Sequence, residues 1–331
     1  MPCHGARGDG PGIQCGATAK LLMKVLIATD YSPAAGLVLD EAVARSWPDG
    51  TSFSVVHAVD LYRFTGFPAF REESEHKLKG LDVGMKASVE KLARAGHHTE
   101  LKILTGFPRT VISRYAKEWN ADLVMAGSHG HSAMVRFLIG SVAQGILRTA
   151  TCSVEIVRSR TGKTAPSSHA MKILLATDNS DCSLRAAHAV SNRPWPLGSV
   201  FKVLSVQELA SGDDQMAWTT LAPIYPKSLL DELIAHGHEQ AECAVKAATE
   251  ILERAGKSVI TGEKLPMGDP RALILDTAEA WGADLIVLAS HGRRGLDRFI
   301  MGSVSEAVAT YAKCSVQVIR NCSTKGEIDD R

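Results

Sequence analysis

No apolar run in this sequence approaches the ~20 residues that a helix needs to cross a membrane. The first twenty residues also lack the apolar core of a secretory signal. Net charge is nearly absent, because 37 Lys and Arg balance 36 Asp and Glu. No overall field would draw the chain to nucleic acid or to an anionic membrane. We therefore expect neither of them as a partner.

Cysteine pairs are lacking too, since the seven cysteines form an odd set without a Cys-x-x-Cys motif. This pattern argues against a disulfide framework and predicts reduced thiols in a cytoplasmic protein. Cys3, His4 and Cys15 match no zinc module, and His236 and His238 would point apart on a helix. We assign no metal site.

Two catalytic signatures are missing. The sequence has no Gly-x4-Gly-Lys-Ser/Thr phosphate loop, which argues against a motor or a fast NTPase, and no Gly-x-Ser-x-Gly nucleophile elbow. We assign no catalytic residue.

The sequence does contain an internal repeat, in which one unit occurs twice. Residues 24–30 (KVLIATD) and 172–178 (KILLATD) agree at five of seven positions, and 121–130 (ADLVMAGSHG) and 283–292 (ADLIVLASHG) agree at six of ten. The offset between the copies grows from 148 to 162 residues, so the second copy carries a net insertion, which we place at 209–227. We expect domains at 23–158 and 171–320, a linker at 159–170, a disordered N-terminal tail at 1–22 and a C-terminal tail at 321–331.

Within each copy, short aliphatic runs alternate with longer amphipathic stretches. This alternation predicts buried parallel strands whose connecting helices cover both faces of a sheet. We expect strands at 25–28, 53–59, 101–104, 123–126 and 154–157, and again at 173–176, 201–206, 259–265, 285–289 and 316–319. Helices of the first copy are expected at 33–45, 85–95, 110–119 and 141–149.

Polar residues follow the first strand of each copy, where an open parallel sheet binds ligands beyond its carboxyl ends. They are Thr29 and Asp30 in the first copy and Thr177 and Asp178 in the second. Two explanations remain open for the aspartates: they contact a ligand, or they cap the following helix.

A glycine-rich segment follows the fourth strand. Gly127 and Gly130 are followed after nine residues by Gly140 and Ser141, and Val142 continues the expected helix. Glycines allow close backbone approach and positive φ, and a helix start capped by serine adds amide donors, so the segment predicts a phosphate site. A plain glycine turn with a serine cap is the alternative, and recurrence of the pattern in the second copy favours the phosphate site.

Each copy resembles a universal stress protein domain, and together the copies cover residues 23–320. ATP-binding members of that family carry Gly-x2-Gly-x9-Gly-Ser/Thr at this place, which the first copy matches in full. The resemblance implies ATP as the ligand, alone or with Mg²⁺, and a fold like that of the adenine-nucleotide alpha hydrolases. It also implies that Asp30 and Asp178 contact the ribose and that the backbone of Ala58 and Val206 pairs with adenine.

The second copy departs from the family pattern at one position, since its residues are Ala289, Gly292, Gly302, Ser303 and Val304. Because alanine resists a positive φ, we expect weaker nucleotide binding there.

Charged residues near the glycines have two interpretations. Arg293 would partly offset the missing glycine by neutralising phosphate, or would be a solvated charge without a function. For His129 and His291, holding the turn through the backbone is favoured over contact with phosphate or slow hydrolysis.

The expected fold is therefore two tandem five-stranded parallel α/β sandwiches of strand order 3-2-1-4-5. The family resemblance implies that the copies pair through their last strands as an internal pseudo-dimer, and a homodimer of whole chains is a further option. The leading hypothesis is a stress-response protein whose ATP occupancy changes its shape or partners. A slow ATPase and a nucleotide-free interaction scaffold are the alternatives.

Overall fold

The computed structural model describes residues 22–30, 32–60, 86–129, 139–158, 170–206, 226–265, 268–292 and 301–320. The predicted tails, except residue 22, lie outside these residues. So do the predicted linker, except residue 170, and the predicted insertion, except residues 226 and 227.

Strands and helices alternate in both halves, as the periodicity predicts, and helical residues 86–94 stand between the second and third strands of the first half. The elements of the first half are β1 (Lys24–Ala28), α1 (Pro33–Ala44), β2 (Ser52–Val59), β3 (His98–Thr105), α3 (Pro108–Glu118), β4 (Leu123–Gly127), α4 (Ser141–Thr149) and β5 (Ser153–Val157). The elements of the second half are β6 (Lys172–Ala176), α5 (Asp181–Ser191), β7 (Val200–Val206), α7 (Lys227–Arg254), β8 (Ser258–Leu265), α8 (Pro270–Trp281), β9 (Leu285–Ala289), α9 (Ser303–Tyr311) and β10 (Ser315–Ile319).

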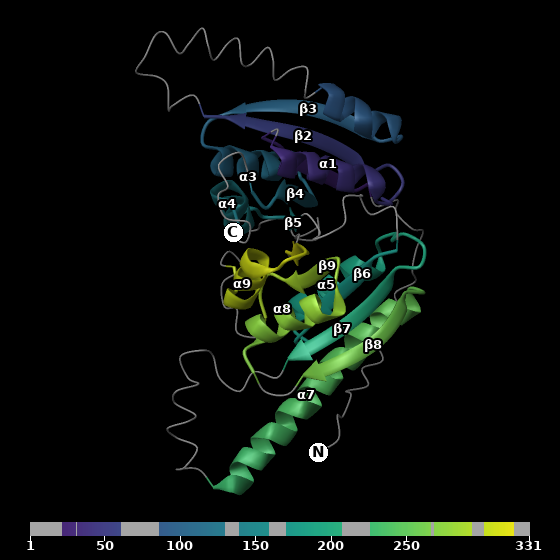
Figure 1. Cartoon of the computed structure of the whole chain (residues 1–331), viewed down its shortest axis with the longest axis vertical. Coiled ribbons are helices and arrows are strands. Elements are labelled where there is room, and N and C mark those ends of the chain that lie inside the picture. Colours follow the sequence, from purple (N-terminus) through teal and green to yellow (C-terminus); the bar gives the residue numbers. More distant parts are fainter. Residues whose placement is uncertain are drawn as a thin grey trace, which may run out of the picture.

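All of these strands join one sheet in the order β3-β2-β1-β4-β5-β10-β9-β6-β7-β8. Each half has the predicted order 3-2-1-4-5 with parallel neighbours. Figure 1 shows the sheet passing from β3 near one end of the molecule to β8 near the other. Strands β5 and β10 pair antiparallel, which confirms the predicted internal pairing of the two copies through their last strands.

Successive residues of each strand are buried on opposite faces of the sheet. In β1, Val25 and Ile27 belong to a core cluster with α1, whereas Leu26 belongs to the cluster on the other face. That second cluster continues through both halves, from Ile112 of α3 to Val308 of α9. The two copies therefore share one hydrophobic core on this face.

The outermost strands are less buried than predicted. Residues 101–104 of β3 are expected to be buried, yet Ile103 is 40% exposed, and Ile260 of β8 is 53% exposed. Each of these strands lies at an end of the sheet and pairs with a single neighbour. An edge strand can have the hydrophobic composition of a buried strand although part of its surface is exposed to solvent.

The second copy is lengthened between its second and third strands. β2 ends at residue 59 and β3 begins at 98, whereas β7 ends at 206 and β8 begins at 258. The predicted insertion falls in this longer connection. It leads into α7, a helix of 28 residues that packs against β7 and β8.

Two arginines, one from each half, bind the end of a helix in the other half. Arg158 Nη2 donates to the carbonyl oxygens of Ala309 (2.6 Å) and Thr310 (3.0 Å) near the end of α9. Arg320 donates in the same way to the carbonyl of Leu147 in α4. Cations are favourable at helix C-termini. The helices that begin at the glycine segments are thus held at their far ends across the interface.

We expect Arg158→Met to lower the free energy of unfolding by about 1–3 kcal/mol, because the buried carbonyl of Ala309 loses its charged donor. Arg148→Met is the matched control, since its exposed guanidinium pairs with Glu306 across the same interface. We expect the control to cost about 0–1 kcal/mol. Urea unfolding of the full chain measures both, and equal losses would contradict the role given to Arg158.

Candidate functional site

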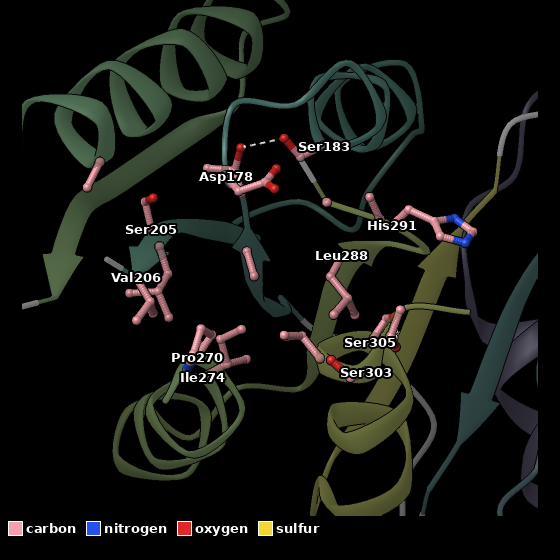
Figure 2. Close-up of a pocket in the computed structure, with 18 of the residues that line it drawn as sticks. Asp178, Ser183, Ser205, Val206, Pro270, Ile274, Leu288, His291, Ser303 and Ser305 are labelled. Atoms are coloured by element: carbon pink, nitrogen blue, oxygen red, sulfur yellow. Dashed lines mark hydrogen bonds between the residues drawn. The ribbon is translucent and has the colours of Figure 1, made fainter. Parts of the chain in front are cut away.

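The order of strands reverses at β6, whose neighbours are β7 and β9. Such a reversal leaves a crevice beyond the carboxyl ends of the strands. A cavity of about 620 Å³ opens at this place, within the roughly 300–1,000 Å³ of small-molecule sites. Figure 2 shows it between Asp178 on one side and Pro270, Ile274 and Ser303 on the other.

This cavity brings together the residues predicted for the second copy. They come from the ends of β6, β7 and β9 and from the start of α9. The predicted residues that line it are Thr177, Asp178, Val206, Ala289, Gly292, Gly302, Ser303 and Val304. Arg293 lies outside the residues that the structure describes.

Asp178 is held in place by the start of α5. Its Oδ1 accepts hydrogen bonds from the backbone nitrogen of Ser180 (3.0 Å) and from the Ser180 hydroxyl (2.6 Å). Ser180 itself caps α5, because its Oγ accepts from the nitrogen of Ser183 at 3.2 Å. The alternative that Asp178 caps this helix is therefore wrong. The carboxylate is oriented at the cavity wall instead.

The carbonyl of Ser290 ties the glycine segment to α9. It accepts hydrogen bonds from the nitrogen of Gly302 (2.8 Å) and the hydroxyl of Ser305 (2.9 Å). Gly302 is the N-cap residue of α9, with φ −67° and ψ 145°, and Ser303 is the first helical residue. No side chain caps this helix. Its first amides therefore suit an anion in the cavity.

The predicted serine caps are wrong in both copies. Gly140 is the N-cap residue of α4, as Gly302 is of α9, and neither helix has a side-chain cap bond. Ser141 and Ser303 stand one position later, inside the first turn. Their hydroxyls therefore do not serve as the cap of the helix.

Two glycines of the second copy are needed for close approach rather than for positive φ. A Cβ on Gly292 would lie 2.5 Å from Oδ2 of Asp178, and one on Gly302 would lie 3.0 Å from the carbonyl oxygen of Ser290. Neither glycine has a φ in the left-handed region. A Cβ at Gly292 would displace the carboxylate of Asp178, and a Cβ at Gly302 would press on the loop backbone at Ser290.

Helix packing explains the glycine that the second copy lacks. Gly127 has no left-handed φ, and a Cβ there would lie 3.1 Å from the carbonyl carbon and oxygen of Ala34 in α1. In the second copy, Ala289 ends β9 and lines the cavity. The premise that alanine resists a positive φ at this position is wrong. The substitution gives no backbone reason for a weaker second site.

The first copy has the same frame where it is described. Asp30 Oδ1 accepts from the nitrogen of Ser32 (3.0 Å), and Ser32 caps α1. The nitrogen of Gly140 donates to the carbonyl of Ser128 (2.6 Å), as in the second copy. Thr29 follows β1, Ala58 lies near the end of β2, and Ser141 and Val142 open α4. Gly130 lies outside the described residues. The glycine-rich segment of the first copy is therefore described only at its two ends.

Helix α7 forms a wall of the cavity that the sequence motifs do not reveal. Gly237, Gln240 and Ala241 line the cavity from this helix. The neighbouring His236 lies one turn from Gln240, with Nε2 2.6 Å from the amide nitrogen. Only an amphipathic pattern with small residues marks this face in the sequence, and the same pattern is typical of any packed helix.

His129 and His291 hold their loops through the serine that precedes each of them. Nδ1 of His129 lies 2.9 Å from Oγ of Ser128, and Nδ1 of His291 lies 3.0 Å from Oγ of Ser290. The favoured turn-holding role uses the side chain rather than the backbone. Burial, followed by the charge of Arg320, lowers the pKa of His291, so its ring is neutral at pH 7. Figure 2 shows this ring turned away from Asp178.

The described residues form neither a metal-ligand cluster nor a membrane-spanning helix. Within the described part of the chain, no three His, Cys, Asp or Glu side chains gather as a metal site. The described cysteines, which are Cys152, Cys182, Cys243 and Cys314, form no disulfide with one another. None of the described helices is apolar over the length needed to span a bilayer.

The fold and the cavity define a doubly wound α/β protein with a ligand cleft at the reversal of strand order. The chain belongs to the universal stress protein family, whose model matches residues 22–158 and 170–320. A putative universal stress protein of Staphylococcus aureus (strain USA300) is 33% identical over 141 residues, which are 41% of this chain and 83% of that protein.

Solved structures agree with this assignment at the level of the fold. A universal stress protein from Archaeoglobus fulgidus DSM 4304 is 21% identical with a TM-score of 0.59, over 90% of this chain and 96% of that one. A putative universal stress protein from Pseudomonas aeruginosa UCBPP-PA14 is 15% identical with a TM-score of 0.56, over 91% and 94%. The predicted family and fold class are confirmed.

Two glycine substitutions should differ in their effect on stability, because the added Cβ meets backbone at one position and a side chain at the other. We expect Gly302→Ala to lower the free energy of unfolding by about 1–3 kcal/mol, because its Cβ would press on a backbone carbonyl. Gly292→Ala should change it by less than about 0.5 kcal/mol, because the side chain of Asp178 can swing away. Thermal unfolding measures both, and a larger loss for Gly292→Ala would contradict this geometry.

Proposed function

We propose that the second half of the chain binds ATP in the cavity beyond β6 and β9. The observation that carries this proposal is that one cavity gathers the residues expected for three parts of a nucleotide. The base would lie by Val206, the ribose on the carboxylate of Asp178, and the phosphates by Gly302 and Ser303. The first half would bind a second nucleotide on its matching frame.

The cavity has an apolar wall, a carboxylate and the start of a helix, which suit the base, the ribose and the phosphates of a nucleotide in turn. Its wall at the end of β7 is apolar, with Leu204 and Val206 from that strand and Ile274 from α8, and suits a planar base. A carboxylate accepts hydrogen bonds from two ribose hydroxyls at once. The start of α9 supplies amides and the positive end of a helix dipole to phosphate, an effect of roughly 0.3–1 kcal/mol for each charge.

The charge of a triphosphate requires more than these amides. Among the described residues that line the cavity, Asp178 carries a negative charge and none is a lysine or arginine. We propose that ATP enters with Mg²⁺, and that Arg293 adds a positive charge at the phosphate end. The metal would supply neutralisation of the phosphates, and the chain itself would supply orientation.

We propose binding rather than turnover as the role of this site. The neutral ring of His291 bonds to Ser290 and is turned away from Asp178. Occupancy by ATP would then act as a signal in a stress or regulatory response. A cytoplasmic location and a homodimer of whole chains stay predictions.

Titration of ATP into the full chain by calorimetry tests this proposal. We carry the Asp30→Ala substitution throughout, so that the first site is weakened and the tighter binding reports on the second site. Asp178→Ala should weaken ATP binding by roughly 10–100-fold, because charge-assisted hydrogen bonds to the ribose are lost.

Asp181→Ala is the matched control. It removes a carboxylate from the first turn of α5, the helix that follows Asp178. Asp181 is exposed and does not line the cavity. We expect this control to bind ATP within about twofold of its parent. Equal affinities of the Asp178 and Asp181 variants, or no heat of binding in the parent, would contradict the proposal.

A further inference from the structure

A buried charged cluster lies where the two halves meet, and none of its residues lines the cavity of the second half. Glu155 of β5 stands directly opposite Gln317 of β10 in the antiparallel pair. Arg45 follows α1 in the first half, and Arg193 follows α5 in the second half, at the equivalent position of the repeat. The exposed fractions are 5% for Arg45, 6% for Arg193, 0% for Glu155 and 6% for Gln317. Buried charges of this kind need partners.

Glu155 lies within reach of the arginines of both halves. Arg45 approaches both of its oxygens: Nη1 donates a hydrogen bond to Oε2 at 2.8 Å, and Nη2 lies 2.6 Å from Oε1 as an ion-pair contact. Nη1 of Arg193 lies 3.9 Å from the same Oε2 and 3.2 Å from the side-chain oxygen of Gln317. Burial alone would raise the pKa of Glu155, but Arg45 and then Arg193 lower it below its ordinary value. The carboxylate is therefore ionised.

Arg193 depends on the other half more than Arg45 does. Its guanidinium is stacked between Trp47 of the first half (4.6 Å to the ring centre) and Trp195 of the second (4.8 Å). Its Nε and Nη2 are buried without a hydrogen-bond partner among the described residues. Burial, with the charge of Arg45, lowers the pKa of Arg193 to about 10, so the group is still charged at neutral pH. The second half supplies no carboxylate at the position opposite Glu155.

The acidic partners come from the first half. Glu155 is one, and Glu41 is the other, with Oε2 3.2 Å from Nε of Arg45. The repeat places Gln317 and Ala189 at the equivalent positions of the second half. Two guanidiniums thus meet two carboxylates when unlike halves pair. Two first halves would bring four carboxylates to two arginines, and two second halves would bring none.

We propose that Glu155 is a shared counter-charge for the arginines of both halves, and that it makes the β5–β10 face a docking surface for the unlike half of this chain. Leaving a buried charge without its partner is costly, whereas a balanced and hydrogen-bonded set is tolerated. Backbone pairing of β5 with β10 does not by itself favour unlike halves over like halves, because the backbones of the two strands are alike. This inference is independent of nucleotide binding.

Moving the carboxylate across the strand pair tests the proposal on the full chain. Glu155→Gln gives both strands glutamine, as in a pair of two second halves, and should lower Tm by roughly 5–10 °C. Gln317→Glu is the matched control, with the same chemical change in reverse, and should leave the chain folded. In Glu155→Gln with Gln317→Glu a carboxylate returns to the strand pair at the position whose side-chain oxygen lies 3.2 Å from Nη1 of Arg193, so Tm should recover part of the loss.

The proposal is overturned if Glu155→Gln keeps the Tm of the wild type, or if the double substitution is no more stable than Glu155→Gln. The first result would mean that the charge is not needed, and the second that Glu155 serves Arg45 alone. Should Gln317→Glu itself fail to fold, Arg193→Met combined with Glu155→Gln decides the question. A shared counter-charge predicts that removing Arg193 restores part of the stability, and a further loss of Tm would overturn the proposal.

Discussion

Parallel strands deliver all their carboxyl ends to one edge of a sheet, and the arrangement of this protein depends on that constraint. At β6 the order reverses, so that α5 follows on one face and α8 and α9 lie on the other. The described residues at the ends of β6 and β9 line the cavity at this point. Asp178 and Gly302 owe their common site to this geometry rather than to nearness in the sequence.

Pairing of β5 with β10 turns two such units into one body. It removes an exposed strand edge from each half and joins the hydrophobic cores on one face of the sheet. Arg158 and Arg320 reach across to the last turns of α9 and α4, and the first turn of α9 lines the cavity. The helix that begins at the cavity is therefore positioned by both halves.

Much of the fold could be predicted from the sequence, because periodicity records burial. The expected bounds of α4 and β9 agree with the structure, and both copies have the expected strand order. The described residues that were expected at the second site line one cavity, because they stand at or just after strand ends and at the start of α9. Spacing along the chain is enough to locate such residues.

What the sequence could not predict depends on distances between elements. The glycine at 127 avoids the backbone of Ala34, a contact made only after α1 packs on β4. The N-cap residues of α4 and α9 are Gly140 and Gly302 rather than the serines that follow them, a difference of one residue that depends on local backbone geometry. The wall from α7 and the cluster around Glu155 have no motif, since each is assembled by packing from distant segments.

The most direct measurement of the central claim is a crystal structure of the full chain grown with ATP and Mg²⁺. The account predicts the ribose hydroxyls on the carboxylate of Asp178, the base beside Val206, and the phosphates at the amide end of α9. Nucleotide bound at saturation in another place, with the cavity beyond β6 and β9 left to solvent, would contradict it.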